Sequence, residues 1–465
     1  MVTVRFSKHY FSLPFLLLCA LEFATLYGSV HFAAFVRFSG AEFEIPAAKL
    51  WLTALVFTVV MVICLISMGL FQTRSRVEAS SILLRIILGY LAGGAVLMLI
   101  FYSIPSLNPG RGVLLLSTMI SFFVIGTLHP VFFSLIDEDL LKRKVLVFGA
   151  GDRAKSLERY MRRKSDRRGF EIVGYVPANE SETAIEEDKR LNVGDQLYQY
   201  IFNRGVQEVV IAPDDMRGGL PIDELLSCKM SGVSVLDIQK FIEREARKIE
   251  VEILQPGWLL FDDGFKTHAV YGFFKRAFDL FASLLLLSVT WPFMLATAIA
   301  ISIEEGFKSP KFYKQVRVGL NGEPFEVIKF RSMRVDAESD GKARWATKND
   351  NRITRVGDFI RKTRLDELPQ IFNVLKGEMS FIGPRPERPE FVERLREFIP
   401  LYDDRHRVKP GITGWAQLKY PYGASDQDAI QKQKYDLYYT KNWSLLLDVL
   451  ILMQTVEVVL FGKGR

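Results

Sequence analysis

Long apolar stretches separated by short polar loops fill the first third of the chain. Four of them, at about 11–36, 49–71, 82–104 and 112–135, each approach the ~20 residues that an α-helix needs to cross the hydrocarbon core of a membrane. The pattern predicts a four-helix transmembrane bundle over residues 1–140. A cleaved signal peptide is the alternative for the first stretch, but no small-residue cleavage site closes a short apolar core there.

Basic residues flank these four stretches unevenly. The ends that would share one side of a membrane carry Arg5, Lys8, Arg74, Arg76, Lys142, Arg143 and Lys144. The opposite ends carry Arg37, Lys49 and Arg111. Because cytoplasmic loops are enriched in lysine and arginine, both ends of the bundle are expected to face the cytoplasm.

A fifth apolar stretch, at about 273–303, is interrupted in its middle by Trp291 and Pro292. A straight transmembrane helix is one interpretation, and it would place the residues that follow outside the cell. Basic residues flank both ends of the stretch, which favours a cytoplasmic position for both. A re-entrant helix that breaks near Ser288 and Pro292 satisfies both observations, because proline removes a backbone hydrogen bond and a serine hydroxyl can replace it.

From residue 141 the pattern changes to short β-type runs that alternate with helical segments, which predicts a parallel, Rossmann-like α/β domain over 141–250. The predicted strands are Val145–Phe148, Glu171–Val176, Glu208–Ala212 and Val233–Asp237. The first ends in Gly149–Ala154, a turn that can bring backbone N–H groups to a phosphate. A dinucleotide site also needs an acidic residue about 20 residues on, where this chain has Pro177 and Ala178. A structural or regulatory domain is therefore favoured.

The last third of the chain carries two adjacent carboxylates at the start of an amphipathic helix. Apolar residues recur at the spacing of a helix with one buried face, at Leu365, Leu368, Ile371, Phe372 and Leu375. Because proline is tolerated only in the opening turn, Pro369 places Asp366 and Glu367 at the helix N-terminus. Helix capping is one role for such carboxylates, and binding a metal ion or stabilising a reacting group is the other.

Several cationic side chains lie near these carboxylates in the sequence. They are Lys329 and Arg331 in a predicted strand at 327–333, Arg361 and Arg364 just before the carboxylates, and Arg385 between Pro384 and Pro386. Carboxylates and cations of this kind can hold Mg²⁺ and a diphosphate together, with arginine making bidentate phosphate contacts. The pattern indicates phosphoryl transfer, with a salt-bridged surface as the alternative.

Composition agrees with a membrane protein that meets anions. The 465 residues leave room for about two or three domains, and 49% of them are hydrophobic. The net charge of +7 suits anionic lipids or phosphorylated substrates, while the long apolar stretches disfavour nucleic acid as a partner. The three cysteines, Cys19, Cys64 and Cys228, form neither a disulfide framework nor a CxxC metal site.

Six motifs, in their order along the chain, closely resemble those of the bacterial sugar transferases. They are Lys275-Arg276 with Phe278-Asp279, Lys329 to Met333, Leu365 to Gln370, Asn373 to Ser380, Gly383 to Glu387, and Lys409 to Gln417. The resemblance covers about 273–465 and implies an α+β catalytic domain of the monotopic phosphoglycosyl transferase type, containing the re-entrant helix. A linker is expected at 251–272, and residues 1–250 are similar in architecture to the long members of that family.

The resemblance implies a polyprenyl-phosphate hexose-1-phosphate transferase of the bacterial inner membrane, with its catalytic domain on the cytoplasmic face. Its substrates would be a UDP-sugar, with UDP-glucose as the first expectation, and undecaprenyl phosphate. The reaction would release UMP and begin the assembly of an exopolysaccharide or another glycan. Inner-membrane lipid is an expected partner, and a homo-oligomer is left open.

The same resemblance implies roles for individual residues. Asp366 would be a nucleophile that forms a covalent phosphosugar ester and also a Mg²⁺ ligand, and Glu367 would be its catalytic partner. Phosphate contacts are expected from Lys329, Arg331, Arg361 and Arg385. The substrate pocket is expected to include Pro384, Pro386, Gly411, Thr413 and Gln417.

Two other functions stay open at this point. One is a non-catalytic, nucleotide-sensing membrane scaffold of polysaccharide assembly, which would not need Asp366, Glu367, Lys329 and Arg385 intact. The other is an NAD-dependent nucleotide-sugar modifying enzyme, which would need a complete dinucleotide fingerprint. Near the C-terminus, Lys432, Lys434 and Lys441 among aromatic residues suit a helix lying on lipid headgroups, with core packing as the alternative.

Overall fold

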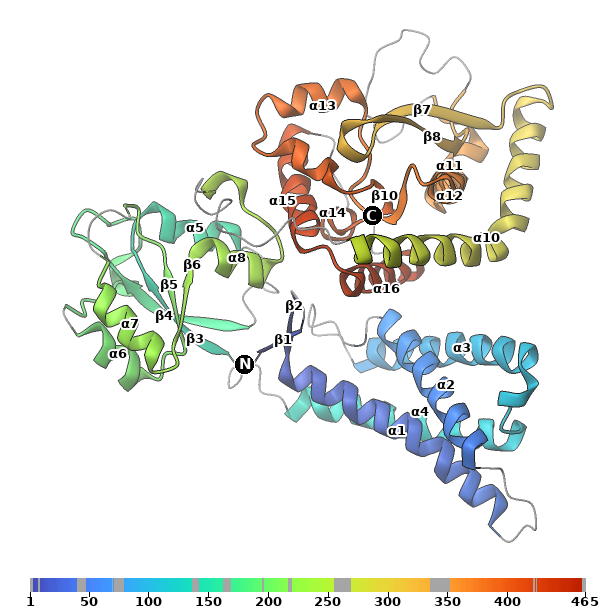
Figure 1. Cartoon of the computed structure of the whole chain (residues 1–465), viewed down its shortest axis with the longest axis horizontal. Coiled ribbons are helices and arrows are strands. Elements are labelled where there is room, and N and C mark those ends of the chain that lie inside the picture. Colours follow the sequence, from blue (N-terminus) through green and yellow to red (C-terminus); the bar gives the residue numbers. More distant parts are fainter. Residues whose placement is uncertain are drawn as a thin grey trace. The chain divides into compact units, whose positions relative to one another are not determined.

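The computed structural model describes residues 3–6, 9–39, 47–68, 70, 79–135, 142–161, 169–194, 196–215, 220–254, 269–334, 352–420, 423 and 425–461. The chain divides into two compact units, Met1–Ala246 and Arg247–Arg465. Their elements are labelled in Figure 1. Most of the expected linker, residues 255–268, lies outside the described residues.

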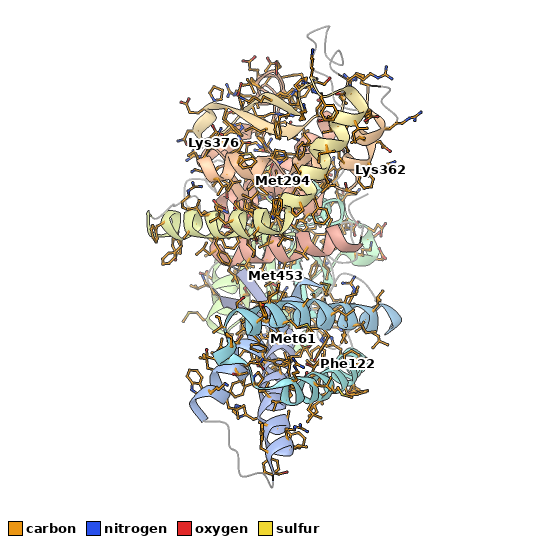
Figure 2. The ribbon with its side chains drawn as sticks, turned by 90° about the vertical axis from the view of Figure 1, so that its right-hand side faces the viewer. Met61, Phe122, Met294, Lys362, Lys376 and Met453 are labelled. Carbon is orange, nitrogen blue, oxygen red and sulfur yellow. The ribbon has the colours of Figure 1, made fainter. Side chains whose placement is uncertain are left out.

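Four long apolar helices follow a short hairpin at the start of the first unit. The hairpin and helices are β1 (Thr3–Phe6), β2 (His9–Ser12), α1 (Leu13–Phe38), α2 (Ala47–Ser67), α3 (Ala79–Ser103) and α4 (Arg111–Leu135), with η1 (Pro105–Leu107) before α4. α1 packs on α2 and α4, and α3 packs on the same two helices. Met61, labelled in Figure 2, is buried in the apolar core between them, and the partly buried Phe122 packs against this core. Each helix is long and apolar enough to cross a membrane, which confirms the prediction of apolar N-terminal helices.

The rest of the first unit is an α/β region with one parallel sheet, as predicted. The strands β3 (Arg143–Phe148), β4 (Phe170–Val176), β5 (Glu208–Ile211) and β6 (Ser234–Asp237) are arranged in the order β4-β3-β5-β6. The helices are α5 (Asp152–Tyr160), α6 (Leu197–Arg204), α7 (Ile222–Met230) and α8 (Ile238–Ala246), with the 3₁₀ turn η3 at Glu187–Lys189. α5 and α8 cover one face of the sheet and α6 and α7 the other (Figure 1), so the central strands are buried and read as apolar runs.

The second unit is an α+β fold in which two small sheets lie against helices. Antiparallel β7 (Phe312–Val318) and β8 (Pro324–Phe330) form one sheet, and parallel β9 (Ser380–Ile382) and β10 (Gly411–Thr413) form the other. The helices are α10 (Ala269–Glu305), α11 (Arg355–Lys362), α12 (Gln370–Lys376), α13 (Pro389–Arg396), α14 (Trp415–Lys419), α15 (Asp426–Asn442) and α16 (Leu445–Phe461). The 3₁₀ turns are η4 (Val251–Ile253), η5 (Leu320–Gly322), η6 (Leu365–Glu367) and η7 (Tyr402–Arg407).

Helix α10 contains Pro292 and is continuous over 37 residues. Figures 1 and 2 show that it changes direction sharply, near Met294 in Figure 2. Pro292 has no N–H to donate to the carbonyl of Ser288, which breaks the helical hydrogen-bond ladder there. The Ser288 hydroxyl donates to the carbonyl oxygen of Leu285 at 2.8 Å and so does not pair the carbonyl that Pro292 leaves free. The re-entrant course of this helix in a membrane stays a prediction.

A buried polar network ties the start of α10 to β9. Lys275 Nζ donates to Asp448 Oδ2 at 2.8 Å and to the carbonyl oxygen of Ile382 at 3.1 Å. Asp279 Oδ1 accepts a hydrogen bond from the backbone N–H of Phe381 at 2.9 Å. These charged residues at the start of an apolar helix therefore hold the helix against the strand that leads to the turn at 383–386.

The second unit begins upstream of α10, where Ile249 and Val251 are buried in its core. Lys434 of α15 is 1% exposed and forms a 2.5 Å ion pair with Glu250, and Lys441 is buried too. A headgroup-facing position is therefore wrong for Lys434 and Lys441. The alternative, core packing, applies because a carboxylate from the chain before α10 neutralises the buried ammonium of Lys434.

Candidate active site

Asp366 and Glu367 lie in the 3₁₀ turn η6, which directly precedes α12. Arg364 enters the turn with a positive φ of 60°. Because Pro369 has no N–H, it cannot continue an α-helical ladder back through the carboxylates, and α12 begins only at Gln370. The prediction placed both carboxylates at the helix N-terminus; the structure places them just before α12, in a separate and tighter 3₁₀ turn.

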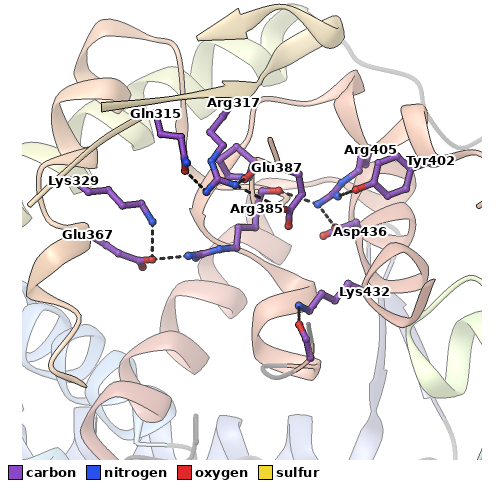
Figure 3. A network of polar contacts seen from close by, with 12 residues as sticks. Gln315, Arg317, Lys329, Glu367, Arg385, Glu387, Tyr402, Arg405, Lys432 and Asp436 are labelled. Atoms are coloured by element: carbon purple, nitrogen blue, oxygen red, sulfur yellow. Dashed lines mark hydrogen bonds and ion pairs between the residues drawn. The ribbon is translucent and has the colours of Figure 1, made fainter. Parts of the chain in front are cut away.

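Glu367 is held by cationic side chains from three different elements. Its Oε1 accepts hydrogen bonds from Arg385 at 2.7 Å and Lys329 at 3.3 Å (Figure 3). Its Oε2 lies 3.6 Å from the guanidinium of Arg364. Burial by itself raises the pKa of this carboxyl, but the charges of Arg385, Lys329 and Arg364 outweigh burial and hold the pKa well below the ordinary glutamate range. Glu367 is therefore ionised at neutral pH and is a weak proton acceptor.

Asp366 has a different environment. Its Oδ1 atom is buried and has no hydrogen-bond partner among the described residues. Burial and the adjacent charge of Glu367 raise the pKa of Asp366 to about 6, against the opposing charges of Lys329, Arg361 and Arg385. At neutral pH this carboxylate is mostly ionised and keeps one oxygen unshared. Since a buried polar atom without a partner costs about 1–3 kcal/mol, the arrangement indicates a place for a ligand.

Two of the predicted phosphate-binding arginines also have a buried nitrogen without a hydrogen-bond partner in the described part of the chain, Nη1 of Arg361 and Nε of Arg331. Arg361 projects from α11, and its charge acts on Asp366, so it belongs to the same cluster. Arg331 follows β8, which ends at Phe330 and not at residue 333 as predicted. No described contact joins Arg331 to the carboxylates.

Asn373 sets the position of Lys329 relative to the carboxylate turn. This buried side chain of α12 accepts a hydrogen bond from the backbone N–H of Ile328 at 3.0 Å and donates to the carbonyl oxygen of Glu326 at 2.6 Å. Both partners lie in β8, the strand that also carries Lys329. The side-chain amide of Asn373 thus makes the backbone hydrogen bonds that a neighbouring strand would make, and it holds α12 against the edge of β8.

The turn at 383–386 packs backbone to backbone on β10. The N–H of Gly383 donates to the carbonyl oxygen of Thr413, and the N–H of Gly411 donates to that of Pro384, both at 2.9 Å. A Cβ atom on Gly411 would lie 2.0 Å from the backbone nitrogen of Gly383, so this approach requires glycine. Gly411 and Thr413 are predicted to line the pocket, and in the structure their backbones pair with the turn that carries Arg385.

The other predicted pocket residues are placed less directly. Pro386 accepts a hydrogen bond from Arg317 Nη1 at 3.1 Å through its carbonyl oxygen, so both prolines beside Arg385 are anchored by their backbone. Gln417 is half buried in α14, and no contact within the described residues links its side chain to the carboxylates. Its role in the pocket stays a prediction.

A buried layer behind Arg385 was missed by the sequence analysis. Arg405 of η7 donates to the carbonyl oxygen of Arg385 at 2.9 Å, to Asp436 Oδ2 at 2.8 Å and to the Tyr402 hydroxyl at 2.7 Å (Figure 3). Burial raises the pKa of Asp436 to about 6, although Arg405 acts against this shift. The sequence signal for this layer is Asp436, a charged residue beside Tyr438 in an apolar stretch, because a buried charge needs a partner.

The cluster can bind a ligand with two phosphate groups and present an oxygen nucleophile to it. Arginine and lysine side chains are suited to phosphate contacts, and the carboxylate of Asp366 is suited to act as a nucleophile. Mg²⁺ also fits, because Oδ1 of Asp366, which no described residue pairs, is the kind of hard oxygen ligand that this ion prefers. The described residues contain no group of three or more potential metal-binding side chains, so phosphate oxygens and water would complete its coordination.

Comparison with known proteins matches this part of the chain to one family. The sequence profile of the bacterial sugar transferases matches residues 270–462. A UDP-glucose:undecaprenyl-phosphate glucose-1-phosphate transferase of Xanthomonas campestris pv. campestris is 35% identical over 335 residues, which cover 69% of this chain and 67% of that protein.

Two further relatives are similar over shorter stretches. A UDP-N-acetylgalactosamine-undecaprenyl-phosphate N-acetylgalactosaminephosphotransferase of Aeromonas hydrophila is 42% identical over 240 residues, 52% of this chain and 55% of its own. A UDP-glucose:undecaprenyl-phosphate glucose-1-phosphate transferase of Klebsiella pneumoniae is 37% identical over 300 residues, 63% of each protein. This chain thus spans between about half and two thirds of the length of these relatives. On the profile match and the shared length, the chain belongs to the bacterial sugar transferase family.

Proposed function

We propose that this chain transfers a hexose-1-phosphate from a UDP-sugar to undecaprenyl phosphate and releases UMP. The observation that carries the proposal is the buried Oδ1 of Asp366, which has no partner among the described residues, beside an ionised Glu367 that three cations hold in place. The names of the relatives describe this class of reaction. The product would serve as the first membrane-bound intermediate of an exopolysaccharide or another glycan.

In the first step, an oxygen of Asp366 attacks the β-phosphorus of the UDP-sugar. A new O–P bond forms, the bond from that phosphorus to the oxygen shared with the α-phosphate breaks, and UMP leaves with the electron pair. No proton has to be removed from Asp366 at neutral pH, since its pKa is about 6. Lys329, Arg361 and Arg385 bind the phosphate oxygens and stabilise the charge that develops on them.

In the second step, a phosphate oxygen of undecaprenyl phosphate attacks the same phosphorus and displaces Asp366, which regenerates the carboxylate. Splitting the transfer into two displacements is the usual benefit of covalent catalysis. Glu367 keeps Arg385 and Lys329 oriented between the two steps. Because its pKa is held low, it stays ionised and keeps these ion pairs. Mg²⁺ on Asp366 would supply neutralisation of the diphosphate charge.

The lipid substrate is supported by the apolar helices. We propose that α1 to α4 form a transmembrane bundle over 1–140, and that α10 enters and leaves the cytoplasmic face of the bacterial inner membrane as a re-entrant helix. α10 is long and apolar enough to cross a membrane, and it exposes Phe281, Trp291, Leu295 and Ile303. This course would place the active site beside a lipid phosphate that cannot leave the bilayer.

The sugar is proposed as glucose, with N-acetylgalactosamine as the second candidate. The names of the relatives include both, with identities of 35% and 37% for the two glucose transferases and 42% for the N-acetylgalactosamine enzyme. The described contacts of Asp366 and Glu367 involve cationic side chains and identify no sugar-binding residue. The two UDP-sugars therefore have to be compared directly.

The test is UMP release by the purified full chain in lipid nanodiscs that contain undecaprenyl phosphate and Mg²⁺. We expect turnover with one of the two UDP-sugars and its loss in Asp366→Asn and Glu367→Gln. Lys314→Ala is the control, because Lys314 forms an exposed ion pair with Glu326 on the neighbouring strand. Without the lipid, the wild type should retain a phosphosugar on the peptide that contains Asp366. Undiminished turnover in both carboxylate variants would refute the proposal.

A further inference from the structure

The glycine turn of the α/β region, which has the form of a phosphate-binding turn, is filled by a carboxylate of the same chain. Gly151 precedes the first residue of α5, and the next two backbone N–H groups point out of the helix start. Asp214 Oδ2 accepts from the N–H of Asp152 at 3.0 Å, and Oδ1 accepts from the N–H of Arg153 at 2.7 Å. These are the donors that a pyrophosphate group would use in a dinucleotide-binding domain.

The space above Gly151 is also taken by this carboxylate. A Cβ atom on Gly151 would lie 2.0 Å from Asp214 Oδ2. In a dinucleotide site, the missing side chain at such a glycine lets the pyrophosphate approach the backbone. Here the same feature admits Asp214, so the glycine turn does not by itself indicate a nucleotide.

A second carboxylate closes the turn from inside. Glu182 is 3% exposed, and its Oε2 accepts from the backbone N–H groups of Ala150 at 2.8 Å and Ala178 at 3.0 Å. Its Oε1 accepts from the N–H of Asp214 at 2.9 Å, which fixes the residue that fills the turn. Both carboxylate oxygens of Glu182, an acidic residue that follows β4, thus accept hydrogen bonds from backbone amides of the described residues.

The fold implies a dinucleotide at this switch point of the sheet, and the residues do not fit one. We propose that Asp214 takes the position of a ligand phosphate and closes the α/β region to nucleotides, and that the turn becomes an anion site only when this carboxylate is removed. An incoming phosphate would have to displace an intramolecular group whose effective concentration is high, and it would meet the negative charge of Glu182. An NAD-dependent activity of this region is disfavoured for the same reason.

Hydrogen exchange of the full chain tests the proposal, with the peptide that spans residues 149–155 as the readout. Inorganic pyrophosphate and NAD⁺ at millimolar concentration should leave the exchange of this peptide unchanged in the wild type. In Asp214→Ala the amides of Asp152 and Arg153 should exchange at least tenfold faster, and pyrophosphate should slow them again. Asp214→Asn, which keeps the shape but not the charge, should lie between the two.

The control is Asp223→Ala, which removes an exposed aspartate from α7 of the same region and should behave like the wild type. Because Asp214 is itself exposed, its removal is expected to leave the region folded. Saturable protection of the wild-type turn by pyrophosphate or NAD⁺ would overturn the proposal. So would a folded Asp214→Ala protein whose turn does not respond to pyrophosphate.

Discussion

The turns at 149–153 and 364–367 both look like anion sites in the sequence, and they differ in what satisfies their polar atoms. At the first, backbone N–H groups are paired with Asp214 and Glu182. At the second, the buried Oδ1 of Asp366 lacks a partner among the described residues. A motif shows that a backbone can hold a phosphate, but only the surrounding side chains show whether room and hydrogen-bonding capacity are left for one.

The two turns also differ in electrostatics. In the α/β region, the carboxylates of Asp214 and Glu182 accept hydrogen bonds from backbone N–H groups, so negative charge lies against the positive ends of peptide dipoles. In the catalytic unit, cations from three elements converge on one carboxylate and leave the neighbouring one underpaired. Groups with strongly perturbed pKa values gather at functional sites because the structure there keeps interactions open for a ligand. The following variants test this contrast, from the largest expected effect to the smallest.

Arg405→Met should have the largest effect, because it leaves Asp436 buried without its cation. Breaking a buried ion pair costs about 3–5 kcal/mol, and the thermal midpoint of the catalytic unit should fall. In Arg405→Met combined with Asp436→Leu, stability should recover while UMP release stays low, since the carbonyl of Arg385 still lacks its donor. Recovery of both stability and full activity would show that Arg405 does not position Arg385.

Arg385→Lys should reduce kcat by about 10²–10³-fold, equivalent to roughly 3–4 kcal/mol of lost transition-state stabilisation. Lysine keeps the charge but loses the planar guanidinium that contacts Glu367 and is proposed to bind phosphate as well. UMP release measures the loss, and the thermal midpoint should stay close to that of the wild type. Arg394→Lys is the matched control on an exposed ion pair of α13, and an equal loss there would contradict the assignment.

Glu182→Ala should lower the free energy of opening of the α/β region by about 1–3 kcal/mol, because it leaves the buried amide of Ala150 and the partly buried amide of Ala178 without this acceptor. Asp214→Ala should cost about 1 kcal/mol or less, because the amides that it frees are exposed to water. Hydrogen exchange of β3 and β5 measures both. Equal costs would mean that the two carboxylates do not play the separate roles inferred from their burial.

The smallest effect is the pH dependence of the first displacement. Protonation removes the nucleophile, so the rate of phosphosugar labelling at Asp366 should fall about tenfold per unit below pH 6, equivalent to about 1.4 kcal/mol per unit. Labelling in a single turnover without lipid avoids the titration of undecaprenyl phosphate, whose phosphate ionises near pH 6 as well. A rate that stays level down to pH 5 would contradict the raised pKa of Asp366.

Much of the fold could be read from local patterns. The apolar N-terminal helices follow from stretches near the length of a membrane span, and the four parallel strands follow from apolar runs that alternate with helices. The cluster of Asp366, Glu367, Lys329 and Arg385 could be predicted because its members lie in separate motifs rich in charge, glycine and proline. The predicted helix boundaries were less accurate. Because of Pro369, α12 begins after the two carboxylates, and the spacing of apolar residues does not reveal this.

By itself, the sequence determined which segments are apolar, where strands and helices alternate, and which side chains can do phosphate chemistry. The tertiary structure alone decided which of these side chains stay available. Asp214 reaches the turn at residue 152 and Arg405 reaches Arg385 across long stretches of chain. A hydrogen bond depends on distance and direction in space. No spacing along the chain could therefore show that a carboxylate of the chain fills one turn, while the other keeps a buried oxygen without a partner in the part of the chain that the structure describes.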